Sequence, residues 1–384
     1  MQDVFITKIH IVKVRHLENV EINLSDTERK HLILTGKNGS EKTSLLNAMS
    51  DKIKIIQEFQ NYFPDSTVDG YNPAEYDLAT FINNINLHVN IFYSQQEIYP
   101  LETFFAYIPV FRTNHINPKS IESIDIKDKT LINRNASKDF LRYIISLDYQ
   151  LYSAKSDKNE EMESNLVKWF DNFLMALRDI YDCQELQLQR DAKNLTFNIK
   201  MPGHESFALY EMSDGYAAFL DIYMELLMRF EEGGAIVDYT MPAIVMIDEP
   251  EAHLHVELQK RALPFLVKMF PNVQFIVATH SPFIMTSLEN AIVYDLEKNE
   301  RLEGPSFYSY ETVVESFLGT STYSNELIRY FERYKELCFK NRTPDENEEF
   351  LNAKAELEIR SIPSTELYIA FQELEKKRKA AVNG

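Results

Sequence analysis

Residues 36–43 place the strongest constraint on this chain, because they nearly reproduce a loop that binds phosphate groups. The segment reads Gly-Lys-Asn-Gly-Ser-Glu-Lys-Thr, against the pattern G-x-x-x-x-G-K-[ST]. In that pattern, backbone N–H groups surround the phosphates, the lysine reaches the outer phosphates and the hydroxyl holds Mg²⁺. Lys42 and Thr43 supply the last two groups, but Glu41 stands where the second glycine is expected.

Glu41 is the one position of this loop that departs from the pattern. Glycine serves there because the backbone must approach phosphate closely, often at dihedral angles that other residues avoid. A glutamate adds a Cβ, a long side chain and a negative charge beside a polyanion. The sequence therefore predicts a recognisable loop with impaired nucleotide binding. Glu41 is either a tolerated natural variant or a substitution introduced into the chain.

The residues around the loop provide the strand, loop and helix that such a site needs. The apolar run 31–35 is typical of a buried central strand, and a helix is predicted from Ser44 onward. Upstream, segments 4–12 and 20–24 alternate apolar and polar residues, which predicts two half-buried strands near a sheet edge.

Two further apolar strands end in side chains that can do chemistry. Strand 243–247 ends at Asp248 and Glu249, and after a helix at 259–269, strand 274–278 is followed by His280. Alternating strands and helices predict a parallel sheet whose carboxyl ends share one ligand-binding edge. Asp248 would position Mg²⁺ and Glu249 would polarise the attacking water. Alternatively, Asp-Glu-Pro merely ends a strand and His280 is structural; the upstream loop favours the chemical interpretation.

Two other segments are ambiguous from sequence. Ser213 and Gly215 precede an apolar helix and could offer N–H groups and a hydroxyl to an anion, although a simple helix cap is the commoner role. His253 and His255, with Glu251 and Glu257, suggest a metal site. Because no third ligand has clear spacing, we favour an intersubunit or domain contact over zinc.

Composition limits the class of protein. The net charge of −19 argues against nonspecific nucleic-acid binding over the whole surface, but it leaves a local basic groove open. Only two cysteines occur, without metal-ligand spacing, which favours a cytoplasmic location. We expect no signal peptide and no membrane contact, because no charged start precedes an apolar stretch and no apolar run has bilayer length.

In order and spacing, segments 36–43, 213–216, 247–251 and 278–282 resemble the ABC-type ATPases, in the branch of the OLD-family, RecF-like and SMC-head proteins. The resemblance implies an α/β P-loop ATPase head. Its central sheet would be mixed but largely parallel, with an antiparallel N-terminal β subdomain, a helical insertion and a helical C-terminal tail. It also implies ATP and Mg²⁺ as ligands and two protomers that enclose two ATP molecules.

The resemblance assigns a role to each site residue. Glu249 would be the general base and His280 the switch residue, while Thr43 and Asp248 would hold Mg²⁺. Nucleotide contacts would come from Arg15, Gly36, Asn38, Gly39, Ser40, Glu41, Lys42, Thr43 and Ser44, and across the dimer from Ser213 and Gly215. The glutamine that the family places between loop and signature is not assigned, and Gln95 and Gln96 are guesses.

The resemblance also predicts four regions: 1–115, the N-terminal half of the head; 116–190, a mainly helical insertion; 191–305, the C-terminal half; and 306–384, a helical region for binding a partner. Within the last region, 344–349 is predicted to be a turn or exposed linker. No heptads indicate a coiled-coil arm, and no acidic Toprim nuclease domain follows residue 300.

An ATPase head without a coiled-coil arm or a Toprim domain is similar to the ATPase subunits of bacterial antiphage systems such as Septu. These include retron-linked versions, and they pair with an HNH nuclease. The resemblance therefore implies a homodimer or higher oligomer that controls a separate nuclease. Two alternatives stay open: a RecF-like repair ATPase that binds DNA in its dimer groove, and an assembly protein in which Glu41 has abolished nucleotide use.

Overall fold

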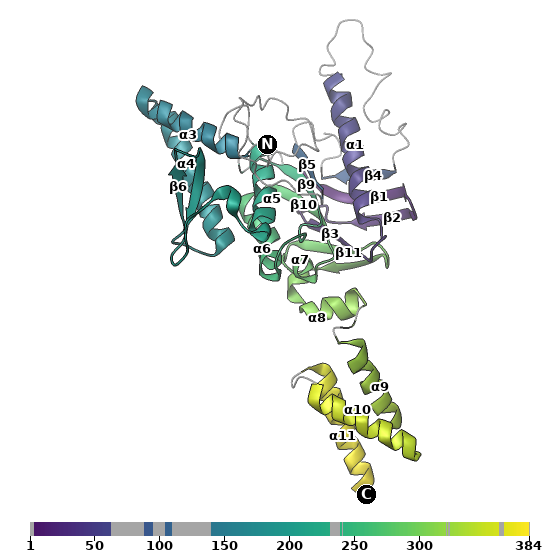
Figure 1. Cartoon of the computed structure of the whole chain (residues 1–384). Helices are drawn as coiled ribbons and strands as arrows, with labels where there is room; N and C mark the ends of the chain where they lie inside the picture. Colours follow the sequence, from purple (N-terminus) through teal and green to yellow (C-terminus); the bar gives the residue numbers. More distant parts are fainter. Residues whose placement is uncertain are drawn as a thin grey trace, which may run out of the picture. The chain divides into compact units, whose positions relative to one another are not determined.

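The computed structural model describes residues 4–62, 88–94, 104–109, 140–230, 239, 241–319, 321, 323–360 and 365–383. The chain divides into two compact units, Met1–Ser309 and Tyr310–Gly384 (Figure 1). Within the described residues, no helix is both long enough and apolar enough to span a bilayer.

The first unit is built on a six-stranded sheet with the order β12-β11-β3-β10-β9-β5. All neighbouring strands are parallel except the antiparallel pair β11–β12. Every residue of β3, β9, β10 and β11 is buried, as the apolar runs predict. The strands are β3 His31–Thr35, β5 Phe104–Ile108, β9 Ala243–Asp248, β10 Val273–Ala278, β11 Ala291–Asp295 and β12 Glu300–Glu303.

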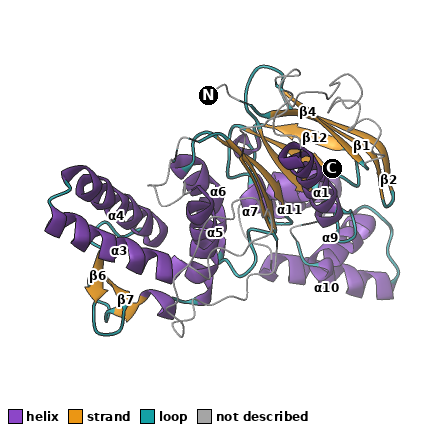
Figure 2. Ribbon diagram, turned by 90° about the horizontal axis from the view of Figure 1, so that it is seen from above, coloured by secondary structure: helices purple, strands orange, loops and turns teal. Residues whose placement is uncertain are grey.

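Helices cover both faces of this sheet. Helix α1 (Lys42–Tyr62) packs its residues Leu45, Leu46 and Met49 on one face, in a core shared with the antiparallel sheet. Helices α5 (Asp214–Phe230) and α6 (Val256–Met269) lie on the opposite side (Figure 2). The short helix α7 (Pro282–Met285) follows β10. The predicted α/β head, with its mixed and largely parallel sheet, is thus confirmed.

A second sheet forms the predicted antiparallel N-terminal subdomain, in the order β2-β1-β4. Strands β1 (Ile6–Val14), β2 (Leu17–Asn23) and β4 (Val89–Tyr93) make it up. Strands were expected over 4–12 and 20–24, which makes the turn between them longer than the one observed. Val14 pairs directly with Leu17, because Arg15 adopts a left-handed backbone (φ 53°) that allows a tight reversal.

Gln274 joins the two sheets. Its side chain is fully buried on β10, accepts the Ile6 N–H at 2.7 Å and donates to the Ile6 carbonyl at 2.9 Å and the Lys30 carbonyl at 2.8 Å. The amide thereby satisfies both backbone groups of Ile6, as a neighbouring strand would. This contact holds the antiparallel sheet beside the strand that leads to His280.

Replacing Gln274 with leucine is expected to destabilise the first unit by about 3 kcal/mol. The N–H and the carbonyl of Ile6 would stay buried, but both would lose the hydrogen bond that the Gln274 amide provides. Urea denaturation followed by circular dichroism would measure the shift. Gln189→Leu is the control, since Gln189 is exposed and its side chain donates a hydrogen bond to Gln187 on the surface. Equal midpoints for the two variants would contradict the expectation.

In the sequence, a helical pair and a third, small sheet come between β5 and β9 of the central sheet. Helices α3 (Phe140–Asp157) and α4 (Glu160–Tyr181) agree with the helical spacing expected over 137–182, of which residues up to 139 lie outside those described. An antiparallel sheet follows, made of β6 (Gln187–Asp191), β7 (Thr196–Lys200) and β8 (Phe207–Ala208), and then a 3-10 turn, Leu209–Glu211.

The C-terminal unit contains a short helical stretch (α8, Tyr310–Thr312, and a π-helical turn, Val313–Phe317) and helices α9 (Asn325–Cys338), α10 (Pro344–Arg360) and α11 (Glu366–Asn383). The prediction of a turn or linker at 344–349 was wrong. Proline favours the first helical position, and acids favour the first turn. Thr343 and Glu346 exchange backbone and side-chain hydrogen bonds at 3.0 and 3.3 Å, which forms a capping box.

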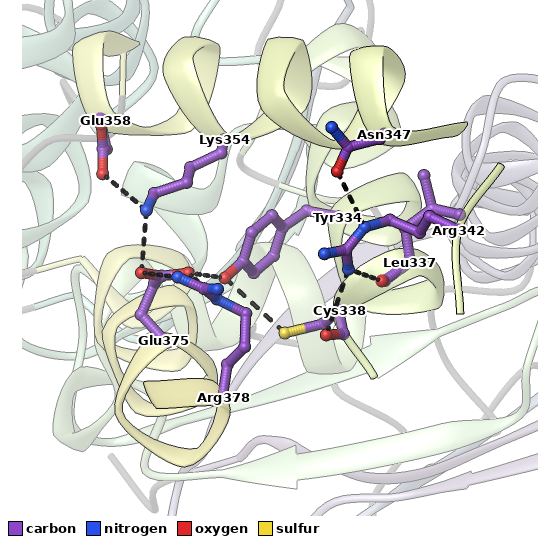
Figure 3. Close-up of polar contacts among 9 residues, drawn as sticks. All are labelled: Tyr334, Leu337, Cys338, Arg342, Asn347, Lys354, Glu358, Glu375 and Arg378. Atoms are coloured by element: carbon purple, nitrogen blue, oxygen red, sulfur yellow. Dashed lines mark hydrogen bonds and ion pairs between the residues drawn. The ribbon is translucent and has the colours of Figure 1, made fainter. Parts of the chain in front are cut away.

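A buried polar network holds these three helices together (Figure 3). Glu375 of α11 is 5% exposed and accepts hydrogen bonds from Arg378, from Lys354 of α10 at 3.0 Å and from the Tyr334 hydroxyl of α9. The Arg378 hydrogen bond lowers the pKa of Glu375 to about 2, with further lowering by Tyr334 and Lys354. The carboxylate is therefore ionised at neutral pH and links all three helices.

Candidate nucleotide-binding site

The Gly-rich loop connects the carboxyl end of β3 to the start of α1, at the edge of the sheet where ligands bind in parallel folds. Gly36 and Gly39 have φ values of 135° and 85°. A Cβ on Gly36 would come within 2.7 Å of the Ser40 hydroxyl, so that position requires glycine. Glu41 has a φ of 70°, the left-handed conformation for which the pattern reserves its second glycine.

The carboxylate of Glu41 is held by three neighbours. It accepts a hydrogen bond from the Ser44 hydroxyl at 2.6 Å, and it lies 3.2 Å from the Arg15 guanidinium and 3.6 Å from His16 Nδ1. Arg15 and His16 form the β1–β2 turn. Only 11% of the Glu41 side chain is exposed. Its charge thus has a cationic partner that sequence reasoning did not identify.

Lys42 is buried within the loop. Its ammonium donates to the carbonyls of Gly36 at 2.9 Å and Lys37 at 3.3 Å, and to the Ser40 hydroxyl at 3.2 Å. Burial lowers the pKa of Lys42, while Glu249 and Asp248 act to raise it. The loop therefore encloses one ammonium facing the carboxylates at the end of β9.

Thr43 and Asp248 come together as the sequence predicts. The Thr43 hydroxyl donates to Asp248 Oδ2 at 2.8 Å, and Asp248 is 1% exposed. Burial raises the pKa of Asp248, and the Thr43 hydrogen bond partly opposes that rise. A hydroxyl and a carboxylate are the hard oxygen ligands that Mg²⁺ prefers, so the residues present fit this metal.

The candidate zinc ligands were His253, His255, Glu251 and Glu257. Within the ranges that the structure describes, no group of three or more His, Cys, Asp or Glu side chains could hold a metal ion. His253 and His255 are both exposed, and His255 immediately precedes α6.

Glu249 and His280 lie on neighbouring strand ends. Glu249 is half-buried with a φ of 46°, and its N–H donates to the Ala278 carbonyl at 2.8 Å. Burial lowers the pKa of His280, and Lys42 lowers it further, whereas Glu251 and Glu249 act to raise it. His280 is therefore neutral at pH 7 and can both donate and accept a hydrogen bond.

The segment around Ser213 begins α5, as expected for a helix start. Ser213 is exposed, and Gly215 packs so closely on the 253–255 loop that a Cβ there would lie 3.3 Å from the His253 carbonyl. The two ambiguous segments of the sequence are therefore neighbours in space.

Sequence reasoning missed the role of Gln259, considered Glu251 only as part of a metal cluster, and could not place other residues. Glu251 accepts the His280 N–H at 2.7 Å, and Gln259 accepts the Ser281 hydroxyl at 2.6 Å. Glu251 lies in the 247–251 segment that carries the resemblance, whereas the only sequence signal for Gln259 was its position at the start of the expected helix 259–269. Gln95 and Gln96 lie outside the described residues.

Residues 32–286 match the family model described as "AAA domain, putative AbiEii toxin, Type IV TA system". The chain is 24% identical to the Septu protein PtuA of Bacillus mycoides over 372 residues, which cover 90% of this chain and 49% of that protein. It is 21% identical to the Retron Ec83 probable ATPase of Escherichia coli over 456 residues, covering 91% and 82%.

The chain thus spans about half the length of the Septu relative and most of the retron relative. Among solved structures, it resembles an Smc head bound to the C-winged helix domain of ScpA, with 13% identity, a TM-score of 0.40 and coverage of 76% of this chain and 93% of that one. So distant a likeness adds nothing about the site. The predicted kinship with Septu and retron ATPases is confirmed, and the chain belongs to the AAA-domain family whose model matches residues 32–286.

Proposed function

We propose that this chain is an ABC-type ATPase that binds Mg-ATP between two protomers and thereby controls a partner nuclease in antiphage defence. The observation that carries the proposal is the 2.8 Å contact of Thr43 with Asp248, beside the buried Lys42. These groups belong to segments about 200 residues apart, and they meet only if the loop and the strand end form one site.

In this proposal, each residue at the edge of the sheet has a separate role in ATP hydrolysis. Thr43 and Asp248 would hold Mg²⁺, which when bound neutralises charge on the phosphates. Lys42 and the loop N–H groups would bind the outer phosphates. Glu249 would accept a proton from the attacking water, and His280 would contact the terminal phosphate.

The second protomer would complete the site. Ser213 is exposed at the start of α5, where N–H groups and the helix dipole favour an anion. In the proposed dimer, this segment would face the phosphate loop of the other protomer. The 253–255 loop packs on Gly215 and would lie at the same interface.

The proposal of a nuclease partner rests on the relatives. Their names, a Septu protein and a retron probable ATPase, support a role in antiphage defence. We assign binding of the partner to the C-terminal unit, 310–384, because the ATP site would lie in the other compact unit.

Sedimentation with and without Mg-ATP tests the proposal. We expect the Glu249→Gln variant to shift to a larger species with Mg-ATP but not with ADP, because bound ATP would no longer be consumed. We also expect a nuclease to be encoded beside the gene of this chain, and we expect that nuclease to sediment with it. Lys42→Ala is the matched control and should not respond. An unchanged assembly state in both variants would contradict nucleotide control, and salt-sensitive DNA binding by the chain alone would favour a repair role.

A further inference from the structure

We propose that Glu251 is a positioning residue, which holds the backbone of His280 and links it to the exposed 253–255 loop. The inference rests on the proposed function, because it assigns His280 to the terminal phosphate. It adds a residue that fixes the position of His280. It also adds a structural connection through which a movement of His280 would be transmitted to the 253–255 loop at the proposed dimer interface.

The first support is a pair of hydrogen bonds between the two strand ends. Glu251 Oε1 accepts the His280 N–H at 2.7 Å, and the Glu249 N–H donates to the Ala278 carbonyl at 2.8 Å. Both bonds join the chain that follows β9 to β10: one to Ala278, its last residue, and the other to His280, two residues later.

The residue after His280 is tied to the same region. The Ser281 hydroxyl donates to Gln259 Oε1 at 2.6 Å, and Gln259 Nε2 donates to the Leu254 carbonyl at 2.8 Å. The same hydroxyl accepts the N–H groups that begin α7. His280 is therefore bracketed by two side chains, Glu251 and Gln259, both from the segment after Asp248.

The backbone of Glu251 also shapes the exposed loop. The Leu254 N–H donates to the Glu251 carbonyl at 2.9 Å, which closes a turn around His253. His253 has a φ of 69°, and its carbonyl lies against Gly215. Glu251 thus contacts the His280 backbone through its side chain and, through its carbonyl, closes the turn whose His253 carbonyl lies against Gly215. A shift of His280 would displace this turn.

The charge of Glu251 is separable from its hydrogen bond. Glu251 Oε2 is buried and has no hydrogen-bond partner among the described residues, while the carboxylate acts electrostatically on Lys42 and His280. Accepting an N–H requires one oxygen and no charge. Glutamine keeps that oxygen and alanine removes it, so the two substitutions separate positioning from charge.

Hydrogen exchange at the His280 amide tests the proposal without relying on ATP turnover. In the full chain, Glu251→Ala should speed this exchange about tenfold, because the N–H loses its acceptor, whereas Glu251→Gln should leave it unchanged. Glu257→Ala is the matched control, since Glu257 is exposed and pairs with Lys260. With Mg-ATP, we expect Glu251→Ala to lower kcat about tenfold with unchanged ATP affinity, and Glu251→Gln to retain kcat.

Two outcomes would decide against this role of Glu251. Unchanged exchange in Glu251→Ala would show that Glu251 does not hold His280. Loss of kcat in both variants, with normal exchange in Glu251→Gln, would assign the effect to charge instead. If the unsubstituted chain hydrolyses no ATP, the proposed function fails, while the exchange measurement still decides whether Glu251 positions His280.

Discussion

Replacing Glu249 with glutamine is expected to lower ATP hydrolysis at least about a hundredfold while Mg-ATP still binds. General-base catalysis contributes roughly 10²–10⁴ to such rates, and an amide cannot accept the proton. Glutamine keeps the size of the side chain, and the backbone bond from Glu249 to Ala278 does not involve the carboxylate. The loss should therefore appear in kcat, with little change in the affinity for nucleotide.

Single-turnover hydrolysis and equilibrium binding would separate these two quantities. Glu257→Gln is the control, because it makes the same chemical change on an exposed residue of α6. Should Glu249→Gln hydrolyse ATP at the original rate, another group would have to be the base. Loss of binding together with turnover would instead indicate that the substitution disturbs the end of β9.

Replacing Glu41 with glycine is expected to tighten Mg-ATP binding about tenfold, or ~1.4 kcal/mol. The substitution removes a carboxylate from the loop that would surround the phosphates, and glycine adopts the observed φ of 70° without a Cβ penalty. The gain is limited, because Arg15 lies 3.2 Å from that carboxylate and already offsets part of its charge.

Calorimetric titration of four proteins would measure both effects: the original chain, Glu41→Gly, Arg15→Ala and the double variant. If Arg15 neutralises Glu41, then Arg15→Ala should weaken binding more in the original chain than in the Glu41→Gly background. Equal affinity for the original chain and Glu41→Gly would mean that the loop accommodates the carboxylate. Binding only after Glu41→Gly would identify the original chain as a nucleotide-free form of the ATPase.

Much of the first unit could be predicted from local patterns. The apolar runs at 31–35, 243–247 and 274–278 can only be buried strands in this context, and the helices between them require the strands to be parallel. Parallel strands place their carboxyl ends at one edge. The meeting of Thr43 with Asp248 could therefore be expected before either was seen in space.

Local patterns were weaker where one signal has two meanings. Pro344 and the acids after it occur in exposed turns and also in the first turn of helices, and only the capping box of Thr343 and Glu346 separates the two. The turn at Arg15 was placed too broadly for a similar reason. Polar residues that end a strand pattern can equally well continue it on the solvent side.

The sequence by itself determined the motifs, the order of strands and helices, and the unusual residue at position 41. Only the tertiary structure decided which side chains stabilise them: Arg15 beside Glu41, Gln274 between the sheets and Glu251 on the His280 backbone. The physical reason is that periodicity depends on neighbouring residues, whereas a hydrogen bond between distant segments depends on register and packing. Those are set when the sheets assemble, and no local pattern encodes them.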